Sequence, residues 1–474
     1  MKLKAILISL VLLMAMFSSS LLLNEASGNS TERKAIVDEN LLEALSSTLE
    51  PVEVIVTFQD GKMDSRTEIL QEVGIQKGLF LNSLPMAGVL ATDDQVKKLA
   101  QSPEVISVYL NKQLQYENEG ATANTGVDEV RANQQMTKQN GGLPVSGAGI
   151  GVVINDSGVD GTHQDLEYGN HLVQNVLSST NLHAIDALLP ITYIENVPNT
   201  DNNSGHGTHV AGIVGGTGAM SGGKYEGVAP GASLIGYGSG AALAILDTLG
   251  GFDYALTHQR EYNIRIITNS WGDTSQAGKE FDPFDPINIA TKKLYDRGII
   301  TVFSAGNSGP DAATISGNYK KAPWVITVAA GDDSYQLADF SSRGIEGKGG
   351  TVTVDGKEWT WVDWPTVTAP GVDIISTRVL SPLPLLGATK DATAIDPGYL
   401  PYYTTMSGTS MAAPHAAGVI ALMLDADPTL TPLEVKSILE NTARTMPEYE
   451  IWETGAGYID AFRSVEKAFQ HAQN

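Results

Sequence analysis

The sequence predicts an α/β protein with a doubly wound, mostly parallel sheet and helices on both faces, preceded by a small α+β domain of the ferredoxin type. The first observation is a set of continuous apolar runs at 150–154, 264–268, 299–303 and 325–329. Such runs are typical of parallel strands that are buried on both faces. The second is that helical segments alternate with these runs, as a doubly wound sheet requires. The third is a separate strand and helix pattern at 52–110.

The pattern at 52–110 predicts a β-α-β-β-α-β sandwich. Alternating residues from Val52 indicate a strand, and Gly88 begins a short second one. An amphipathic helix is expected between these strands, at 64–73, and a second one after them, at 93–101. Another strand, at 105–110, closes the unit.

The amino terminus predicts a secretory signal peptide over residues 1–28. Lys2 and Lys4 precede an apolar stretch, and Gly28 is a small residue suited to cleavage, with a cut after Ala26 as the alternative. An uncleaved membrane anchor is the other interpretation, but serines break the apolar run and it is short for a span. We therefore expect a secreted, extracellular protein without a stable membrane anchor.

Composition narrows the class of protein. The chain has 474 residues, 42% of them hydrophobic, no cysteine and a formal net charge of −24. The absence of cysteine excludes disulfides, thiolate metal sites and thiol nucleophiles. The negative charge argues against binding of nucleic acid or of anionic membranes. It fits a protein kept soluble in salt, and it fits an ordinary acidic secreted enzyme equally well.

Three regions interrupt the alternation of strands and helices in the second part of the chain: residues 167–204, 346–366 and 380–402. The pair Asp355-Gly356 lies between two alternating segments of the second region and predicts a hairpin. The third region contains prolines and precedes a candidate nucleophile, so we expect an ordered loop near a cleft.

Three short motifs carry the chemistry. Asp156 lies in Val-Val-Ile-Asn-Asp-Ser-Gly-Val-Asp, His206 in Gly-His-Gly-Thr-His-Val-Ala-Gly, and Ser410 in Ser-Gly-Thr-Ser-Met-Ala-Ala-Pro-His. A serine hydroxyl becomes a nucleophile when an imidazole takes its proton and a carboxylate orients that imidazole. Ser410 also opens an apolar helical run, so its hydroxyl is expected at a helix amino terminus, which favours negative charge. We expected Pro414 to be tolerated within about the first turn of that helix.

These motifs resemble those of the subtilisin-like serine proteases, in the same chain order of Asp, His and Ser, over about residues 145–462. A fourth segment, residues 301–309, resembles the family segment whose asparagine donates to the oxyanion hole, which implies that role for Asn307. The resemblance also implies two backbone edges that clamp an extended peptide, and a glycine on the wall of the first specificity pocket. The residues concerned are Ser270, Trp271 and Gly272 on one edge, Ser304, Ala305 and Gly306 on the other, and Gly317 on the wall.

Two residues depart from the family pattern. Trp271 replaces a commonly aliphatic residue, which is expected to alter the neighbouring subsites, and polar Asn155 precedes Asp156, which puts the local packing in question. Calcium is common in the family and Asp165 matches a ligand position. The loop 217–227 lacks the asparagine that would complete the site, so Asp165 is expected to be a surface carboxylate.

Other polar residues of the motifs have structural interpretations. His209 follows His206 by three residues and could form a metal pair with it, but no third ligand is evident. We expect His209 and His415 to be structural and Asp160 to be a turn or surface carboxylate. No cofactor is expected for the chemistry, and structural calcium stays open.

The resemblance implies a domain organisation with a signal peptide at 1–28, an inhibitory propeptide at 29–120 and a peptidase domain at 121–474. The propeptide would inhibit the enzyme until autocatalytic cleavage within 113–122, with Tyr116 in the specificity pocket. The alternative is that 29–120 is a stable accessory domain. The predicted protein is a monomeric serine endopeptidase that cleaves polypeptides after large or apolar residues; its rival is a catalytically silent scaffold of the same fold.

Overall fold

The computed structural model describes residues 35–48, 50–61, 63–112, 115–116, 125–202, 204–240, 243–380 and 388–473. The predicted signal peptide lies outside these residues, as does all of the predicted cleavage window except Gln115 and Tyr116. In the described part of the chain, no helix is long and apolar enough to cross a membrane.

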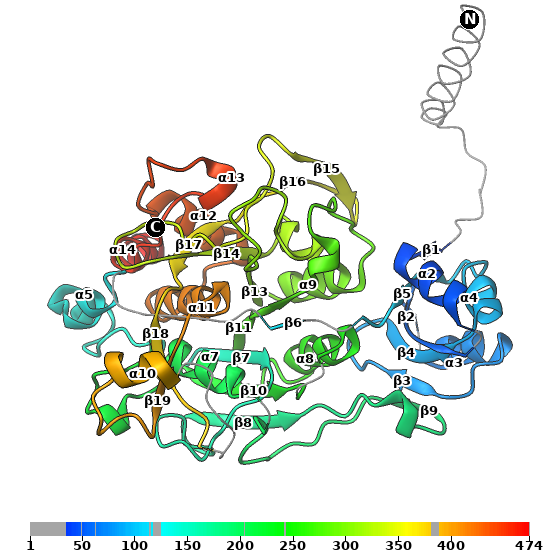
Figure 1. Ribbon diagram of the computed structural model, residues 1–474, viewed down its shortest axis with the longest axis horizontal. Coiled ribbons are helices and arrows are strands. Elements are labelled where there is room, and N and C mark those ends of the chain that lie inside the picture. Colours follow the sequence, from blue (N-terminus) through cyan, green and yellow to red (C-terminus); the bar gives the residue numbers. More distant parts are fainter. Residues whose placement is uncertain are drawn as a thin grey trace, which may run out of the picture. The chain divides into compact units, whose positions relative to one another are not determined.

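A seven-stranded parallel sheet forms the centre of the larger part of the chain (Figure 1), in the order β17-β14-β13-β11-β7-β10-β8. The apolar runs predicted four of these strands to within two residues at either end. In the order of the sheet the strands span Val367–Pro370, Ile326–Gly331, Ile300–Ser304, Ile264–Asn269, Gly151–Asp156, Ser233–Gly238 and Leu172–Leu177.

Strand β7 shows why the sheet is buried on both sides. Val152 and Ile154 belong to one hydrophobic cluster, whereas Val153 between them belongs to another. Side chains of a strand alternate between its faces, so each face of the sheet has a core of its own.

Helices cover both faces, as predicted. Helices α7 (His206–Gly215) and α11 (Thr409–Ala426) pack on one face, and α14 (Ala461–Ala472) packs on α11. Helices α8 (Ile245–Thr257) and α9 (Pro286–Asp296) pack on the other face. The helices α5, α6, α12 and α13 span Val127–Ala132, Gln134–Gln139, Pro432–Thr442 and Ile451–Thr454.

The amino-terminal region has the predicted β-α-β-β-α-β order and forms the sheet β1-β5-β2-β4-β3-β9. The elements located in the sequence correspond to β2 (Val52–Phe58), α3 (Met63–Glu72), β4 (Met86–Ala91), α4 (Asp93–Leu99) and β5 (Val105–Leu110). The predicted order also implied one more strand, whose residues were not identified and which is β3 (Gly78–Phe80). Sequence reasoning missed β1 (Ile36–Val37) and α2 (Glu39–Ser47). It also missed that β9 (Leu188–Pro190), from the region 167–204, adds to this sheet in parallel with β3.

The Asp355-Gly356 hairpin is confirmed. Strands β15 (Gly349–Val354) and β16 (Lys357–Val362) pair antiparallel, and both turn residues have positive φ, 51° and 73°. Positive φ at both central positions is what a type I′ turn requires.

The region 380–402 is more regular than the expected loop. Residues 388–394 form helix α10 (Ala388–Ala394), and β19 (Tyr403–Met406), which follows the region, pairs with β18 (Ile374–Thr377). The segment 381–387 lies outside the described residues.

Candidate active site

Asp156 and His206 are in direct contact at the carboxyl edge of the parallel sheet. Asp156 is the last residue of β7, and His206 is the first residue of α7. The distance from His206 Nδ1 to Asp156 Oδ1 is 2.5 Å, and both side chains are 1% exposed. The structure therefore brings the predicted imidazole and carboxylate together in a site shielded from water.

A second buried carboxylate, Asp201, holds this pair in place. Asp201 Oδ2 accepts hydrogen bonds from Thr208 N at 3.0 Å and Thr208 Oγ1 at 2.7 Å, and Oδ1 accepts one from Gly205 N at 3.0 Å. Oδ1 also accepts the hydroxyl of Ser157, the residue after Asp156, at 3.2 Å. One carboxylate thus caps the helix that begins with His206 and braces the turn that follows Asp156.

Burial raises the pKa of Asp201, and the donors from Thr208 and Gly205 oppose that shift. Sequence reasoning missed Asp201, which was part of a loop-rich region in the sequence. Its position five residues before His206 was the available signal.

Ser410 is the second residue of α11 and is fully buried. Its hydroxyl donates to the carbonyl of Ser270 at 3.1 Å, and Ser270 Oγ donates to the carbonyl of Ser410 at 2.8 Å. The bond from Ser270 Oγ replaces a hydrogen bond that the helix itself lacks. Pro414 has no N–H, so it cannot donate to the carbonyl four residues earlier, and Ser270 supplies the missing donor. Pro414 is the sixth residue of the helix, later than the first turn expected for it.

Asn307 has a fixed orientation. Its Oδ1 accepts bonds from Thr409 N and from Thr409 Oγ1, both at 2.9 Å. Thr409 Oγ1 also accepts a bond from Gly306 N at 3.1 Å. Because the amide oxygen accepts both bonds from Thr409, the nitrogen Nδ2 is the end of the amide that is left to donate to another group.

The first predicted clamp edge lies against another strand. Strand β12 (Trp271–Gly272) pairs antiparallel with β6 (Gln115–Tyr116), and Trp271 is opposite Tyr116. An edge that accepts one extended segment has the backbone geometry to accept a peptide by strand addition.

The second predicted edge continues from β13, which ends at Ser304. Gly306 has φ of 120°, and a Cβ added there would lie 2.7 Å from Ser316 Oγ and 2.6 Å from Ser342 Oγ. Gly317, one residue beyond Ser316, has φ of 123°. Both positions therefore require glycine, for their backbone conformation and, at Gly306, for space.

The two residues that depart from the family pattern are joined by a hydrogen bond. The indole Nε1 of Trp271 donates to the carbonyl of Asn155 at 2.9 Å, and Asn155 Nδ2 donates to Asn269 Oδ1 at 3.0 Å. Both Trp271 and Asn155 are fully buried. The tryptophan side chain therefore packs into the core and ties the clamp edge to the strand that carries Asp156.

The expectation of a surface carboxylate at Asp165 is wrong. Asp165 is fully buried, and its carboxylate accepts bonds from Met220 N at 2.9 Å and Tyr403 Oη at 2.6 Å. Asp160 is a turn carboxylate as expected, accepting Thr162 N at 3.0 Å, but it too is buried and not on the surface. Among the described residues, no group of three acidic or histidine side chains could hold a metal ion.

Two histidines have the expected structural environments. His209 Nε2 lies 3.1 Å from the carbonyl of Ile374, and burial, the largest cause, lowers the pKa of His209 to about 3. His415 Nε2 lies 2.7 Å from Thr125 Oγ1, and burial lowers its pKa to about 3. Both imidazoles are therefore neutral at pH 7.

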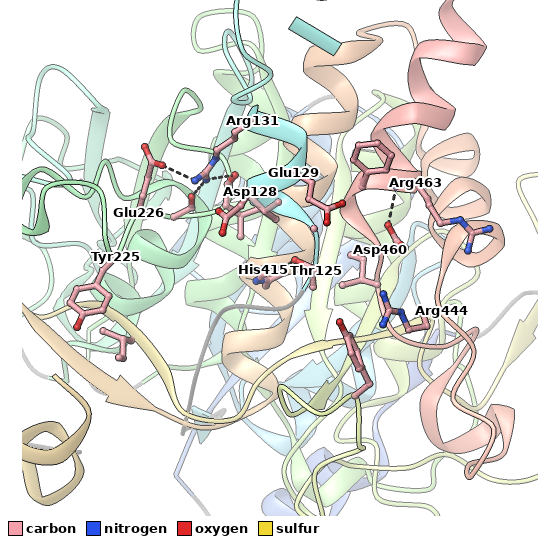
Figure 2. Close-up of a pocket in the computed structure, with 18 of the residues that line it drawn as sticks. Thr125, Asp128, Glu129, Arg131, Tyr225, Glu226, His415, Arg444, Asp460 and Arg463 are labelled. Atoms are coloured by element: carbon pink, nitrogen blue, oxygen red, sulfur yellow. Dashed lines mark hydrogen bonds and ion pairs between the residues drawn. The ribbon is translucent and has the colours of Figure 1, made fainter. Parts of the chain in front are cut away.

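A cavity of about 610 Å³ adjoins His415 and is lined by Arg131, Glu226 and Asp460 among others (Figure 2). Arg131 is bonded to Glu226 at 2.6 Å, and Asp460 accepts the backbone N–H of Arg463 at 2.9 Å. None of the residues predicted for catalysis or peptide binding lines it. Arg131 and Glu226 pair with each other on its wall, and the candidate active site lies elsewhere.

Comparison with known proteins decides the family. The profile of the subtilase family of peptidases matches residues 147–459, about two thirds of the chain, a range that contains all four motifs of the sequence. The chain belongs to the subtilase family. It is accordingly a subtilisin-like, serine-type endopeptidase, as its sequence predicts, and the subtilase fold places Asp156, His206 and Asn307 at one edge of its sheet.

Relatives of this subtilase cover most of its length. Serine protease AprX of Bacillus subtilis (strain 168) is 33% identical over 437 residues, which cover 87% of each chain. Subtilisin E of the same organism is 27% identical over 450 residues, covering 93% of this chain and 92% of its own.

A solved structure gives the same fold. Fervidolysin from Fervidobacterium pennivorans, described as a keratinolytic enzyme related to subtilisin, has a TM-score of 0.61 and 21% identity. The match covers 93% of this chain and spans 64% of that one.

Proposed function

We propose that this subtilase hydrolyses peptide bonds by two-step acyl transfer through Ser410, with His206 as general base, Asp156 as its orienting carboxylate and Asn307 as oxyanion donor. The 2.5 Å bond between His206 Nδ1 and Asp156 Oδ1 is the observation that carries this proposal. This bond supports the tautomer in which Nδ1 carries the proton and Nε2 is the basic nitrogen.

In the first step His206 Nε2 takes the hydroxyl proton as Ser410 Oγ attacks the scissile carbonyl. The oxyanion receives bonds from Asn307 Nδ2 and the backbone N–H of Ser410, and the imidazolium returns its proton to the leaving amine. Water then repeats the sequence on the acyl-enzyme. The amino terminus of α11, where Ser410 lies, favours the negative charge of both tetrahedral intermediates.

We further propose that the enzyme is made as a secreted precursor, with a signal peptide at 1–28, an inhibitory propeptide at 29–120 and a monomeric peptidase at 121–474. Contacts between the amino-terminal sheet and α8 support this organisation. The carboxylate of Asp253 on α8 accepts the backbone N–H groups of Asn82 at 2.9 Å and Leu84 at 3.1 Å, and that of Ser83 between them.

The amino-terminal region also caps the start of α8, where the N–H groups of the helix are the donors. Leu246 N donates to Asn111 Oδ1 at 2.7 Å, and Ile245 N donates to the carbonyl of Lys112 at 3.0 Å. Asn111 and Lys112 directly precede the segment that contains β6. Because β6 occupies the clamp edge at Trp271 and Gly272, a peptide substrate could not pair there until that segment leaves.

Secretion is supported by the sequence of the amino terminus and by one relative, 25% identical over 451 residues, that is named minor extracellular protease Epr of Bacillus subtilis (strain 168). Polypeptides are the proposed substrates. No cofactor takes part in the proposed chemistry. The expected preference for large or apolar residues before the scissile bond remains a prediction.

The test is the fate of the precursor when Ser410→Ala is expressed beside the wild type. We expect wild-type cells to release a form whose amino terminus lies within 113–122, and the variant to accumulate precursor beginning near residue 29. Wild-type protein that keeps residues 29–120 while it cleaves substrate would contradict the propeptide assignment. Equal processing of the variant, in a host lacking extracellular proteases, would contradict self-cleavage by Ser410.

A further inference from the structure

Strand β9 joins two parts of the chain that self-cleavage would separate. It lies after the predicted cleavage window 113–122, whereas its partner β3 lies before that window. In the sheet order β1-β5-β2-β4-β3-β9, strand β3 would be an edge strand without β9. The larger part of the chain therefore completes the sheet of the amino-terminal domain, and a cut within 113–122 would leave the two strands on separate chains.

Backbone hydrogen bonds hold both ends of this pairing. Gly78 N donates to the carbonyl of Ala187 at 2.9 Å, and Ile191 N donates to the carbonyl of Phe80 at 2.6 Å. The carbonyl of Ile191 also accepts the side-chain Nδ2 of Asn82, at 3.4 Å. The two segments are thus bonded beyond both ends of β9, by the main-chain pairing through which a sheet edge binds another strand.

Two side chains of the segment pack against the amino-terminal domain. Leu188 packs on the core cluster of that domain, whose other described members all belong to residues 35–110. Its Cδ2 would lie 3.3 Å from a Cβ added to Gly78. Ile191 is 3% exposed and belongs to the cluster that contains Leu79 of β3 and apolar residues of α8. The segment therefore contributes side chains to the core of a domain that the cut would detach.

Contacts on either side of β9 fix its position. Tyr193 Oη donates to Asp253, the carboxylate of α8 that also accepts the N–H groups of residues 82–84. Before β9, His183 Nε2 lies 3.2 Å from Glu53 Oε1 on β2. The segment is thereby anchored to α8 after β9 and to the amino-terminal sheet before it.

We propose that residues 187–191 form a docking strand that retains the amino-terminal domain on the peptidase after the chain is cut within 113–122. The inference rests on the proposed function, in which Ser410 makes that cut, and adds the surface that controls release. Neither the strand pairing nor the burial of Leu188 depends on the covalent connection, so both persist when it is broken. When the cut follows β6, the retained domain also keeps β6 on the clamp edge, so activity begins only after the docking strand releases the domain.

The test uses the full-length Ser410→Ala chain with a recognition site for an unrelated, sequence-specific protease inserted after Tyr116. Because this chain cannot degrade its own amino-terminal domain, the dissociation constant of the two pieces can be measured after the cut, by dilution and size-exclusion chromatography. We expect the pieces of the otherwise unaltered chain to elute as one complex.

Two variants of β9 provide a matched comparison. Leu188→Asp should raise the dissociation constant about 10- to 100-fold, because the burial of a leucine side chain is lost. Leu189→Asp changes the next residue of the same strand, whose side chain is 46% exposed, and should leave the dissociation constant nearly unchanged.

Either of two results overturns the docking strand. Pieces that elute separately when the unaltered chain is cut refute retention, and this measurement needs no variant of β9. Equal dissociation constants for Leu188→Asp and Leu189→Asp refute the role of the strand, and the pair Leu188→Ala and Leu189→Ala gives the same comparison if an aspartate variant does not fold. A chain with Ser410 intact that cleaves neither itself nor any polypeptide refutes the proposed function instead, since retention is measured without Ser410.

Discussion

Replacing Asp201 by asparagine tests how the site is held together. Asp201 is a pure acceptor for four donors: the N–H and hydroxyl of Thr208, the N–H of Gly205 and the hydroxyl of Ser157. An asparagine has one accepting oxygen, so its amide nitrogen would face two of these donors.

Each buried donor left without an acceptor costs about 1–3 kcal/mol, so Asp201→Asn should lower the free energy of unfolding by roughly 2–5 kcal/mol. The lost brace lies at the helix that begins with His206, and small misplacement of a catalytic group is costly. We therefore expect kcat to fall about 10- to 100-fold in the folded variant, with a smaller change in KM.

Asp160→Asn is the matched control. Asp160 is also a fully buried carboxylate, but the backbone N–H groups that it accepts belong to Thr162 and Leu380, whereas those of Asp201 belong to Gly205 and Thr208. Stability is read from denaturant unfolding in a Ser410→Ala background, which prevents autolysis, and kcat from the active proteins. The reasoning is refuted if Asp201→Asn loses no more kcat than Asp160→Asn at equal loss of stability.

Three further changes test neighbouring contacts. Thr409→Val removes one of the two hydrogen bonds that orient Asn307, so kcat should fall about tenfold. In an Asn307→Ala background the same substitution should cause no additional loss of kcat, which a double-mutant cycle measures. Asp253→Asn should lower the free energy of unfolding of the Ser410→Ala precursor by about 2 kcal/mol, as measured in urea. The stability of the mature enzyme should be nearly unchanged. Burial, with smaller contributions from nearby acids, raises the pKa of Asp285 to about 7, so its contribution to stability is present below pH 4 and lost as the pH rises through 7. Between pH 5 and pH 8, the stability of Asp285→Asn relative to wild type should rise by about 3 kcal/mol in unfolding measurements, because about two pH units of the shift lie in that range, and a constant difference would contradict this.

The sequence predicted the central sheet well because its strands are buried on both faces. A run such as 150–154 has to be apolar throughout, so the strand is visible without knowledge of its neighbours. The hairpin at Asp355-Gly356 was equally visible, because its turn needs residues that tolerate positive φ. Strand β9 was invisible, since only its tertiary pairing with β3 makes Leu188–Pro190 a strand.

The same distinction applies to the candidate site. The motifs around Asp156, His206 and Ser410 identify residue types at fixed spacing, which a sequence can show. Burial of a polar group depends on donors and acceptors contributed by distant segments. For this reason Asp165 was expected at the surface and the importance of Asp201 was missed.

Lys320 is the clearest case of information that the sequence does not contain. In the sequence it is one of two adjacent lysines, a pattern typical of a solvated surface. Its burial and its bond to Ser316 appear only when the chain is folded.

The most direct test of the central claim is covalent labelling of the mature enzyme with a fluorophosphonate, followed by peptide mapping. The account predicts one label per molecule, attached to Ser410, and loss of rapid labelling in His206→Ala although Ser410 is still present. A wild-type protein that cleaves peptides yet carries no label, or carries it on another serine, would contradict the assignment of Ser410 as the nucleophile.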